Sequence, residues 1–144
     1  MYFGLSEEQS FFKDNVKKYL EDNASLDQIR KIASGDDTNI AKEIHQGFLN
    51  LGINGLLVPE EFGGLGLDLL FAAVVSESLG ACAGPVPYIA PYVMAPRAIM
   101  AGGSSAQKEN YLTKIASNEI LVGVGFSEFI GSRNDAGLTF ADAL

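Results

Sequence analysis

The chain has 144 residues, 47% of them hydrophobic, and its 18 acidic and 10 basic side chains give a formal net charge of −8 at pH 7. This length suits a single domain with its own core, whereas the negative charge argues against nucleic acid and anionic membrane surfaces as partners. The apolar runs are too short to insert into a membrane and no secretory signal is recognisable, so we expect a cytoplasmic protein. The single cysteine, Cys82, excludes an internal disulfide and a multi-cysteine metal site.

Three amphipathic helices are predicted before residue 52. Ser6 and Ser25 are each followed three residues later by Gln, which is the capping box that satisfies amides at a helix start. Thr38 can cap the third helix, and Gly52 can close it in the left-handed conformation that glycine tolerates. Apolar residues recur at helical spacing in these segments, so each helix should bury one face.

The middle of the chain alternates irregular segments with more apolar helices. Residues 54–68 read as a Gly/Pro loop, after which Asp68 caps a helix from about Leu69 to Leu79. Because this helix is apolar nearly all round through Val75, we expect it in the centre of a bundle. Prolines between 85 and 91 predict a stiff, irregular stretch, and a helix over about 92–100 can follow if its proline sits in the first turn or kinks it.

The C-terminal part predicts a change from helix to sheet. Ser104 begins another capping box and a helix through Ile115, and the apolar run Ile120–Phe126 then fits a buried strand. One strand cannot form a sheet alone, so the rest of a β domain should come from elsewhere. The predicted fold class is mainly α, an up-and-down helical bundle over residues 1–118 with the first strand of an incomplete β domain over 119–144.

The residues that most often carry chemistry have structural explanations here. Gly63–Gly66 lacks the Lys-Ser/Thr of a P-loop and reads as a tight turn, while Gly123–Gly125 does not complete a dinucleotide fingerprint. Glu60 and Glu61 are adjacent on a loop and should be solvated, and His45 has no second ligand at metal spacing, so we expect it on a solvated helix face. The residues by themselves indicate no catalytic group.

The end of the predicted strand is the most favourable place for a ligand. Ser127 and Glu128 follow the apolar run and precede Gly131 and Ser132, so hydroxyl groups and open amides should gather where a strand meets a loop. An ordinary strand-to-loop transition explains the same pattern.

Several segments together resemble the N-terminal helical domain, and the start of the middle β domain, of the acyl-CoA dehydrogenase family. These segments are Leu5–Gln9, Leu51–Gly66 and Gly102–Leu112. The resemblance implies an enzyme that holds FAD between its middle and C-terminal domains and oxidises the Cα–Cβ bond of an acyl-CoA thioester. A glutamate of the C-terminal domain removes the α proton in this family. We therefore expect no catalysis by these 144 residues alone.

The resemblance also implies site residues and partners. Flavin contacts would come from Val124, Phe126, Ser127 and Gly131, while Ser132 would contact the substrate. The acyl pocket would be lined by Ala90, Pro91 and Met94. The expected partners are the acyl-CoA substrate, an electron-transfer flavoprotein for the full enzyme, and further subunits in a homo- or hetero-oligomer.

Two other functions remain open at this point. One is a non-catalytic helical subunit or binding module that pairs with a flavin-binding partner. The other is a different member of the same superfamily, an oxidase or a flavin monooxygenase, which the reaction of its reduced flavin with oxygen would reveal.

Overall fold

The computed structural model describes residues 4–36 and 38–125, and over these residues the protein is mainly α, which confirms the predicted class. The α-helices are α1 (Glu7–Asn23), α2 (Leu26–Ser34), α3 (Thr38–Leu49), α4 (Leu69–Ala81), α5 (Ala95–Gly102) and α6 (Ser105–Ala116). Two 3-10 turns, η1 (Ile53–Gly55) and η2 (Glu60–Phe62), follow α3, and a π-helical turn, η3 (Ile89–Met94), precedes α5.

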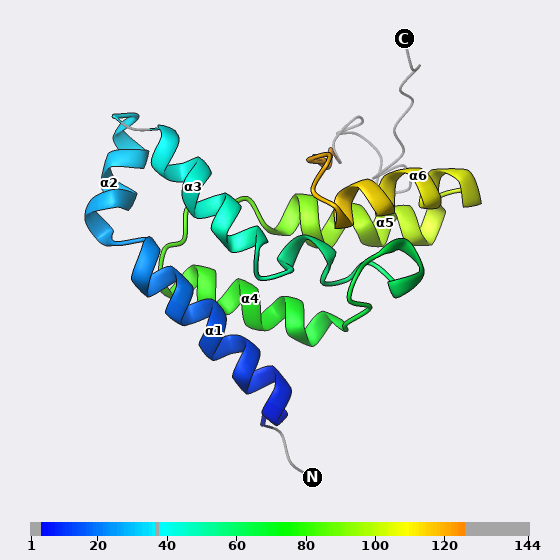
Figure 1. The fold of residues 1–144 in the computed structure, drawn as a ribbon, viewed down its shortest axis with the longest axis horizontal. Helices are drawn as coiled ribbons and strands as arrows, with labels where there is room; N and C mark the ends of the chain where they lie inside the picture. Colours follow the sequence, from blue (N-terminus) through cyan, green and yellow to red (C-terminus); the bar gives the residue numbers. More distant parts are fainter. Residues whose placement is uncertain (1–3, 37, 126–144) are drawn as a thin grey trace, which may run out of the picture.

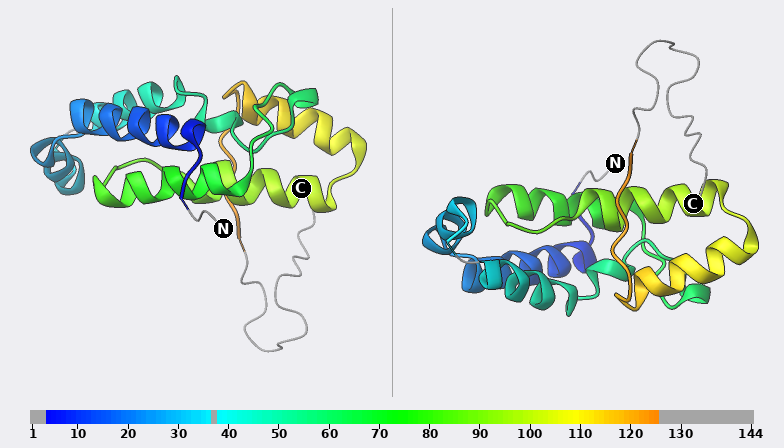
Figure 2. Two further views of the ribbon diagram at one scale, coloured as in Figure 1. Left: turned by 90° about the horizontal axis from the view of Figure 1, so that it is seen from below. Right: turned by 90° about the horizontal axis from the view of Figure 1, so that it is seen from above.

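The helices form two layers. Figure 2 shows α4 and α5 in one layer and α1, α3 and α6 in the other. In Figure 1, α1 runs along α4, while α5 packs against α6 and α2 contacts α3. The apolar core joins the layers. Its fully buried members include Val16, Leu20, Phe48, Ile53, Leu56, Val75, Tyr92, Leu112 and Ile115. Burial of each large apolar side chain contributes about 1.5–3 kcal/mol relative to exposure.

Local signals in the sequence set most helix starts correctly. The hydroxyls of Ser6, Ser25 and Ser104 each accept from the amide three residues later, and the side-chain oxygen of each Gln accepts from the serine amide in return. Asp68 accepts from two amides in the first turn of α4. α3 begins at Thr38, whose side chain lies outside what the structure describes, so its capping role stays a prediction.

Within the long loop between α3 and α4, Gly63–Gly66 forms a tight turn as predicted, with Gly63 and Gly66 at positive φ. Gly52 adopts φ 79°, the left-handed conformation, after the last residue of α3. Amides of Leu65 and Gly66 donate to carbonyls of Gly55 and Val58, both at 2.8 Å, so the two arms of the loop lie side by side. A Cβ on Gly64 would collide with the Val58 carbonyl, and therefore only glycine fits there.

The prediction that α4 is central is wrong at its N-terminal end. Leu69 and Leu70 are 47% and 49% exposed, whereas Val75 is fully buried. α1 is the main helical neighbour of α4. An apolar sequence shows that burial is favourable, but it does not supply a neighbour for every side of the helix.

The predicted strand Ile120–Phe126 is also wrong over the part that the structure describes. Residues 120–125 are extended without forming a strand, and Leu121 is 61% exposed. The reason is the missing partner, because a ladder needs a second strand and no described residue bonds to the backbone of 121–125. The division into domains 1–118 and 119–144 stays a prediction.

Candidate functional site

The π-helical turn η3 is where the backbone departs from regular helix. Pro96 has no N–H, so it cannot donate the hydrogen bond that a continuous regular helix would make at its position, whereas Pro91 lies in the first turn of η3, where no such bond is required. The Ala95 amide instead donates to the Ala90 carbonyl, five residues back. Pro96 sits in the first turn of α5, one of the two arrangements expected for it. Short π-helical segments are rare and occur frequently at functional sites, which makes this turn the first candidate.

η3 brings the predicted acyl-pocket residues together. Pro91 is buried, and Ala90 and Met94 are half-buried on the same turn. Val124, the described member of the predicted flavin contacts, is half-buried in the extended segment and does not belong to this turn. Phe126, Ser127, Gly131 and Ser132 lie outside the described residues.

His45 contacts η3 directly, so the prediction that it lies on a solvated face is wrong. His45 is half-buried on α3, and its Nε2 lies 2.9 Å from the hydroxyl of Tyr92, which is 1% exposed. The tautomer of the imidazole decides which atom donates. Burial lowers the pKa of His45 and raises the pKa of Tyr92, so both groups favour their neutral forms. Lys42 and Glu43 on the same helix suggested a solvated face, and the contact with Tyr92 has no local signal in the sequence.

Tyr88 precedes η3 and carries a buried hydroxyl without a partner. Its side chain is 4% exposed, and its ring stands edge-on to Phe48 with centroids 6.3 Å apart. It is the one buried side-chain oxygen or nitrogen without a hydrogen bond among the described residues. Burial strongly raises the pKa of this phenol, which keeps it protonated. Sequence reasoning missed Tyr88, because the absence of a partner is a property of the fold alone.

A groove of about 350 Å³ borders Tyr88. Its wall is formed by Ser76, Leu79 and Gly80 of α4 and by Ala83, Gly84, Val86, Tyr88 and Ile89 of the following segment. Ser76 is not a free donor, because its hydroxyl donates to the Ala72 carbonyl at 3.0 Å. The groove therefore has a mainly apolar wall, and the unpaired Tyr88 hydroxyl lies buried behind it without exposed area.

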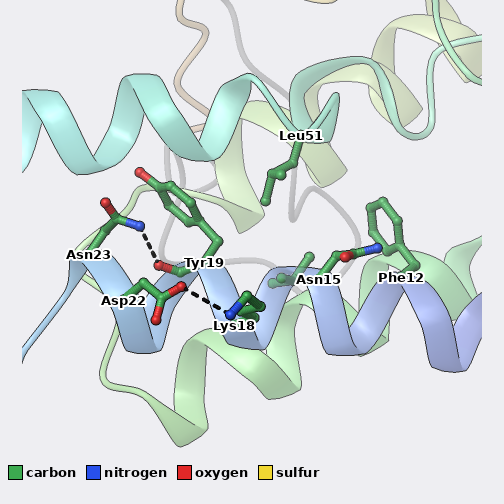
Figure 3. A pocket seen from close by; sticks show the side chains of 8 residues that line it. Phe12, Asn15, Lys18, Tyr19, Asp22, Asn23 and Leu51 are labelled. Carbon is green, nitrogen blue, oxygen red and sulfur yellow. Dashed lines mark hydrogen bonds and ion pairs between the residues drawn. The ribbon is translucent and has the colours of Figure 1, made fainter.

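A second hollow, of about 360 Å³, lies over α1 and carries no comparable group (Figure 3). Phe12, Asn15, Lys18, Tyr19, Asp22, Asn23 and Leu51 line it, with Val16. Lys18 pairs with Asp22 at 3.5 Å, and Asn23 donates to the Tyr19 carbonyl at 2.9 Å. The Tyr19 hydroxyl donates to the Ile44 carbonyl at 2.8 Å. These groups are already paired within the domain.

The described residues contain no group of three or more His, Cys, Asp or Glu side chains that could hold a metal ion. Among them, no helix has the length and apolar character needed to cross a bilayer. Every described Asp and Glu is exposed, including Glu60 and Glu61 as predicted. Cys82 is half-buried against the core, in keeping with a packing role.

Comparisons with known proteins agree with the resemblance. The sequence model of the family described as "Acyl-CoA dehydrogenase, N-terminal domain" matches residues 6–119. Mitochondrial isovaleryl-CoA dehydrogenase of Bos taurus is 31% identical over 127 residues, which cover 87% of this chain and 30% of that protein. (2S)-methylsuccinyl-CoA dehydrogenase of Cereibacter sphaeroides is 34% identical over 134 residues, covering 87% of this chain and 23% of that protein. The chain thus spans less than a third of these relatives.

Solved structures share the fold. A structure described as electron transferring flavoprotein of Acidaminococcus fermentans superposes with a TM-score of 0.63 at 28% identity, covering 84% of this chain and 32% of that chain. Butyryl-CoA dehydrogenase of Megasphaera elsdenii gives 0.60 at 23% identity with the same coverage. A subunit of the ChsE4-ChsE5 complex of Mycobacterium tuberculosis gives 0.65 at 22% identity, covering 83% and 30%. The last two likenesses concern the fold alone.

Proposed function

This chain belongs to the acyl-CoA dehydrogenase family, whose N-terminal domain it contains, and from that premise we propose that it forms the acyl-pocket part of an FAD-dependent acyl-CoA dehydrogenase. The reaction is the desaturation of an acyl-CoA thioester between Cα and Cβ. The observation that carries this proposal is the family match over residues 6–119, which includes the π-helical turn with its three candidate pocket residues.

The chemistry of η3 supports a role in binding an acyl chain. Ala90, Pro91 and Met94 offer carbon and sulfur surface and no charge on a half-buried turn. Each methylene group that an acyl chain buries against such a surface contributes about 0.8 kcal/mol. Met94 is unbranched and adapts its shape, so it is suited to the end of a pocket that measures chain length.

The described residues provide no base for the α proton. A base that abstracts a carbon-bound proton works best when burial raises its pKa toward the working pH, yet every described Asp and Glu is exposed. We therefore assign substrate positioning and exclusion of water to this domain. The base would come from a C-terminal domain, as the family resemblance implies.

The flavin would lie against the extended segment after α6. Residues 121–125 have backbone groups that no other described residue engages, so their amides and carbonyls can meet the polar edge of a flavin ring. In our proposal Val124, Phe126, Ser127 and Gly131 hold the flavin, and Ser132 holds the substrate. When bound, FAD would accept the hydride that leaves the β carbon of the substrate.

The partners of the complete enzyme belong to the same proposal. We propose an electron-transfer flavoprotein as the acceptor of the electrons, further subunits in a homo- or hetero-oligomer, and a cytoplasmic location. The solved structure at 28% identity is described as an electron transferring flavoprotein studied for electron bifurcation, which supports a flavin-linked role.

The test is to isolate the protein at its native length, measure its intact mass by mass spectrometry, and record its visible absorption spectrum. A mass well above 15.3 kDa, with flavin absorption that acyl-CoA bleaches without oxygen, is expected. A colourless protein near 15.3 kDa would contradict the proposal and favour the helical binding module. Rapid reoxidation of the reduced flavin by oxygen would instead indicate an oxidase or monooxygenase.

A further inference from the structure

The turn η3 has one hydroxyl group among its side chains, that of Tyr92. The other five members of the turn are apolar: Ile89, Ala90, Pro91, Val93 and Met94. Because Tyr92 is 1% exposed, its hydroxyl needs a hydrogen-bond partner within the protein. Tyr92 is therefore the side chain through which a strong hydrogen bond can attach this turn to the rest of the domain.

The partner is His45 on α3. Its Nε2 lies 2.9 Å from the Tyr92 hydroxyl, and the two rings have centroids 6.0 Å apart. The residues are 47 positions apart, so the bond joins η3 to a helix that is distant in sequence. The backbone bonds of the turn stay local, because the amides of Tyr92 and Ala95 donate to the carbonyls of Tyr88 and Ala90.

The burial of the phenol favours one direction for this bond. A neutral imidazole has one donor and one acceptor nitrogen, and a phenol has one O–H donor. If Nε2 carried the proton, the O–H of Tyr92 would be buried without an acceptor, which is unfavourable. Tyr92 is satisfied when it donates to an unprotonated Nε2 and the imidazole proton lies on Nδ1. His45 is then the acceptor.

We propose that His45 is a positioning residue for the acyl site: by accepting this hydrogen bond it holds Tyr92, and with it η3, in a fixed place against α3. The candidate pocket residues on the same turn are then held as well: Ala90, Pro91 and Met94. The inference rests on the proposed function, which gives these three residues their role. Dispersion contacts weaken steeply with small displacements, so a turn that is free to shift binds an acyl chain less tightly.

Four substitutions separate the hydrogen bond from general stability. His45→Leu removes the acceptor, whereas His45→Gln keeps an amide oxygen that can accept in place of Nε2. Tyr92→Phe removes the donor. Tyr19→Phe is the matched control, because it also removes a bonded phenol hydroxyl, 2.8 Å from the Ile44 carbonyl and outside η3.

The first measurement determines KM and kcat for the holoenzyme at its native length. The substrate is isovaleryl-CoA or butyryl-CoA, whichever the unsubstituted enzyme turns over faster. His45→Leu and Tyr92→Phe should each raise KM about two- to tenfold at nearly constant kcat, and His45→Gln should keep KM near the native value. The double variant of His45→Leu with Tyr92→Phe should match the single ones, since all three lose the same bond.

A role in stability alone predicts a different result. It lowers the fraction of folded enzyme, and therefore the apparent kcat, without changing KM. We expect this behaviour of Tyr19→Phe. An unchanged KM in His45→Leu, a KM in His45→Gln as high as in His45→Leu, or an equal rise in Tyr19→Phe overturns the inference.

The second measurement needs no turnover. Hydrogen exchange of the native-length protein, followed by mass spectrometry, compares a peptide that spans η3 with one that spans α6. His45→Leu should speed the exchange of η3 about two- to tenfold and leave α6 unchanged. Equal exchange of η3 in both proteins overturns the inference. Faster exchange in a protein that turns over no acyl-CoA would reject the proposed function but support the attachment of η3 by His45, so the two failures are distinguishable.

Discussion

Tyr19 on α1 packs directly against Gly47 on α3. The phenol reaches over the glycine and donates a 2.8 Å hydrogen bond to the Ile44 carbonyl on the same helix. A Cβ on Gly47 would collide with the hydroxyl and ring of Tyr19. The close approach of the two helices at this point therefore depends on the absence of a side chain at position 47.

Replacement of Gly47 by alanine should destabilise the domain by about 1–3 kcal/mol, because overpacking outweighs the better helix propensity of alanine. Chemical denaturation measures the change. Gly80→Ala in α4 is the matched control, since a Cβ there meets nothing within 4 Å. The control should be neutral or gain about 0.5–1 kcal/mol. Equal effects at both positions would show that the contact with Tyr19 is unimportant.

Tyr88→Phe should raise the free energy of unfolding by about 1–3 kcal/mol, because it removes a buried hydroxyl that has no partner. Tyr19→Phe makes the same chemical change where the hydroxyl is bonded, and it should lower the free energy by about 0.5–1.5 kcal/mol. Thermal unfolding of the two variants side by side provides the measurement. A loss of stability in Tyr88→Phe would mean that the phenol has an acceptor after all.

Stability should depend on pH through His45. Burial lowers its pKa below the ordinary 6.5. The unfolded chain then binds the proton more readily, so stability is full above about pH 6.5 and falls as the pH drops from there through the folded pKa. His45→Gln should flatten this slope in urea denaturation. His45 is the only histidine in the chain, so a slope that survives the substitution would assign the effect to other groups.

Met94→Ala should shift the substrate preference toward longer acyl groups, because it empties space on η3. The ratio of kcat/KM between a longer and a shorter acyl-CoA should rise about tenfold for each methylene group newly accommodated. Met100→Ala on α5 also removes a half-buried methionine, but outside η3, and should leave the ratio unchanged. Parallel shifts in both variants would place the chain end elsewhere.

The features that could be predicted from the sequence are those with local signals. Ser104 and its Gln lie within one turn, and the glycine at position 52 satisfies a backbone requirement of its own. The exposed N-terminal end of α4 could not be predicted, because the hydrophobic pattern of a helix does not show which other elements pack against it. The contact of His45 with Tyr92 spans 47 positions and depends on how two helices meet.

The candidate site follows the same division. A family resemblance selected Ala90, Pro91 and Met94 and the structure places them on one turn, but their role in binding stays a prediction. Tyr88 became a candidate only when its burial and missing partner were known. The flavin contacts from Phe126 onward lie outside the described residues, so they too stay predictions.

The π-helical turn η3 also sets the rotational phase of α5, which follows it directly. A π-helical turn holds one residue more than a regular turn, and one residue corresponds to about 100° around a helix axis. Everything after η3 is therefore turned relative to what an uninterrupted helix would present. Ile99 and the extended segment 120–123 line the same hollow. The rotation at η3 determines the side of α5 on which Ile99 lies. The π-helical turn thus orients the surface of α5 that faces residues 120–123.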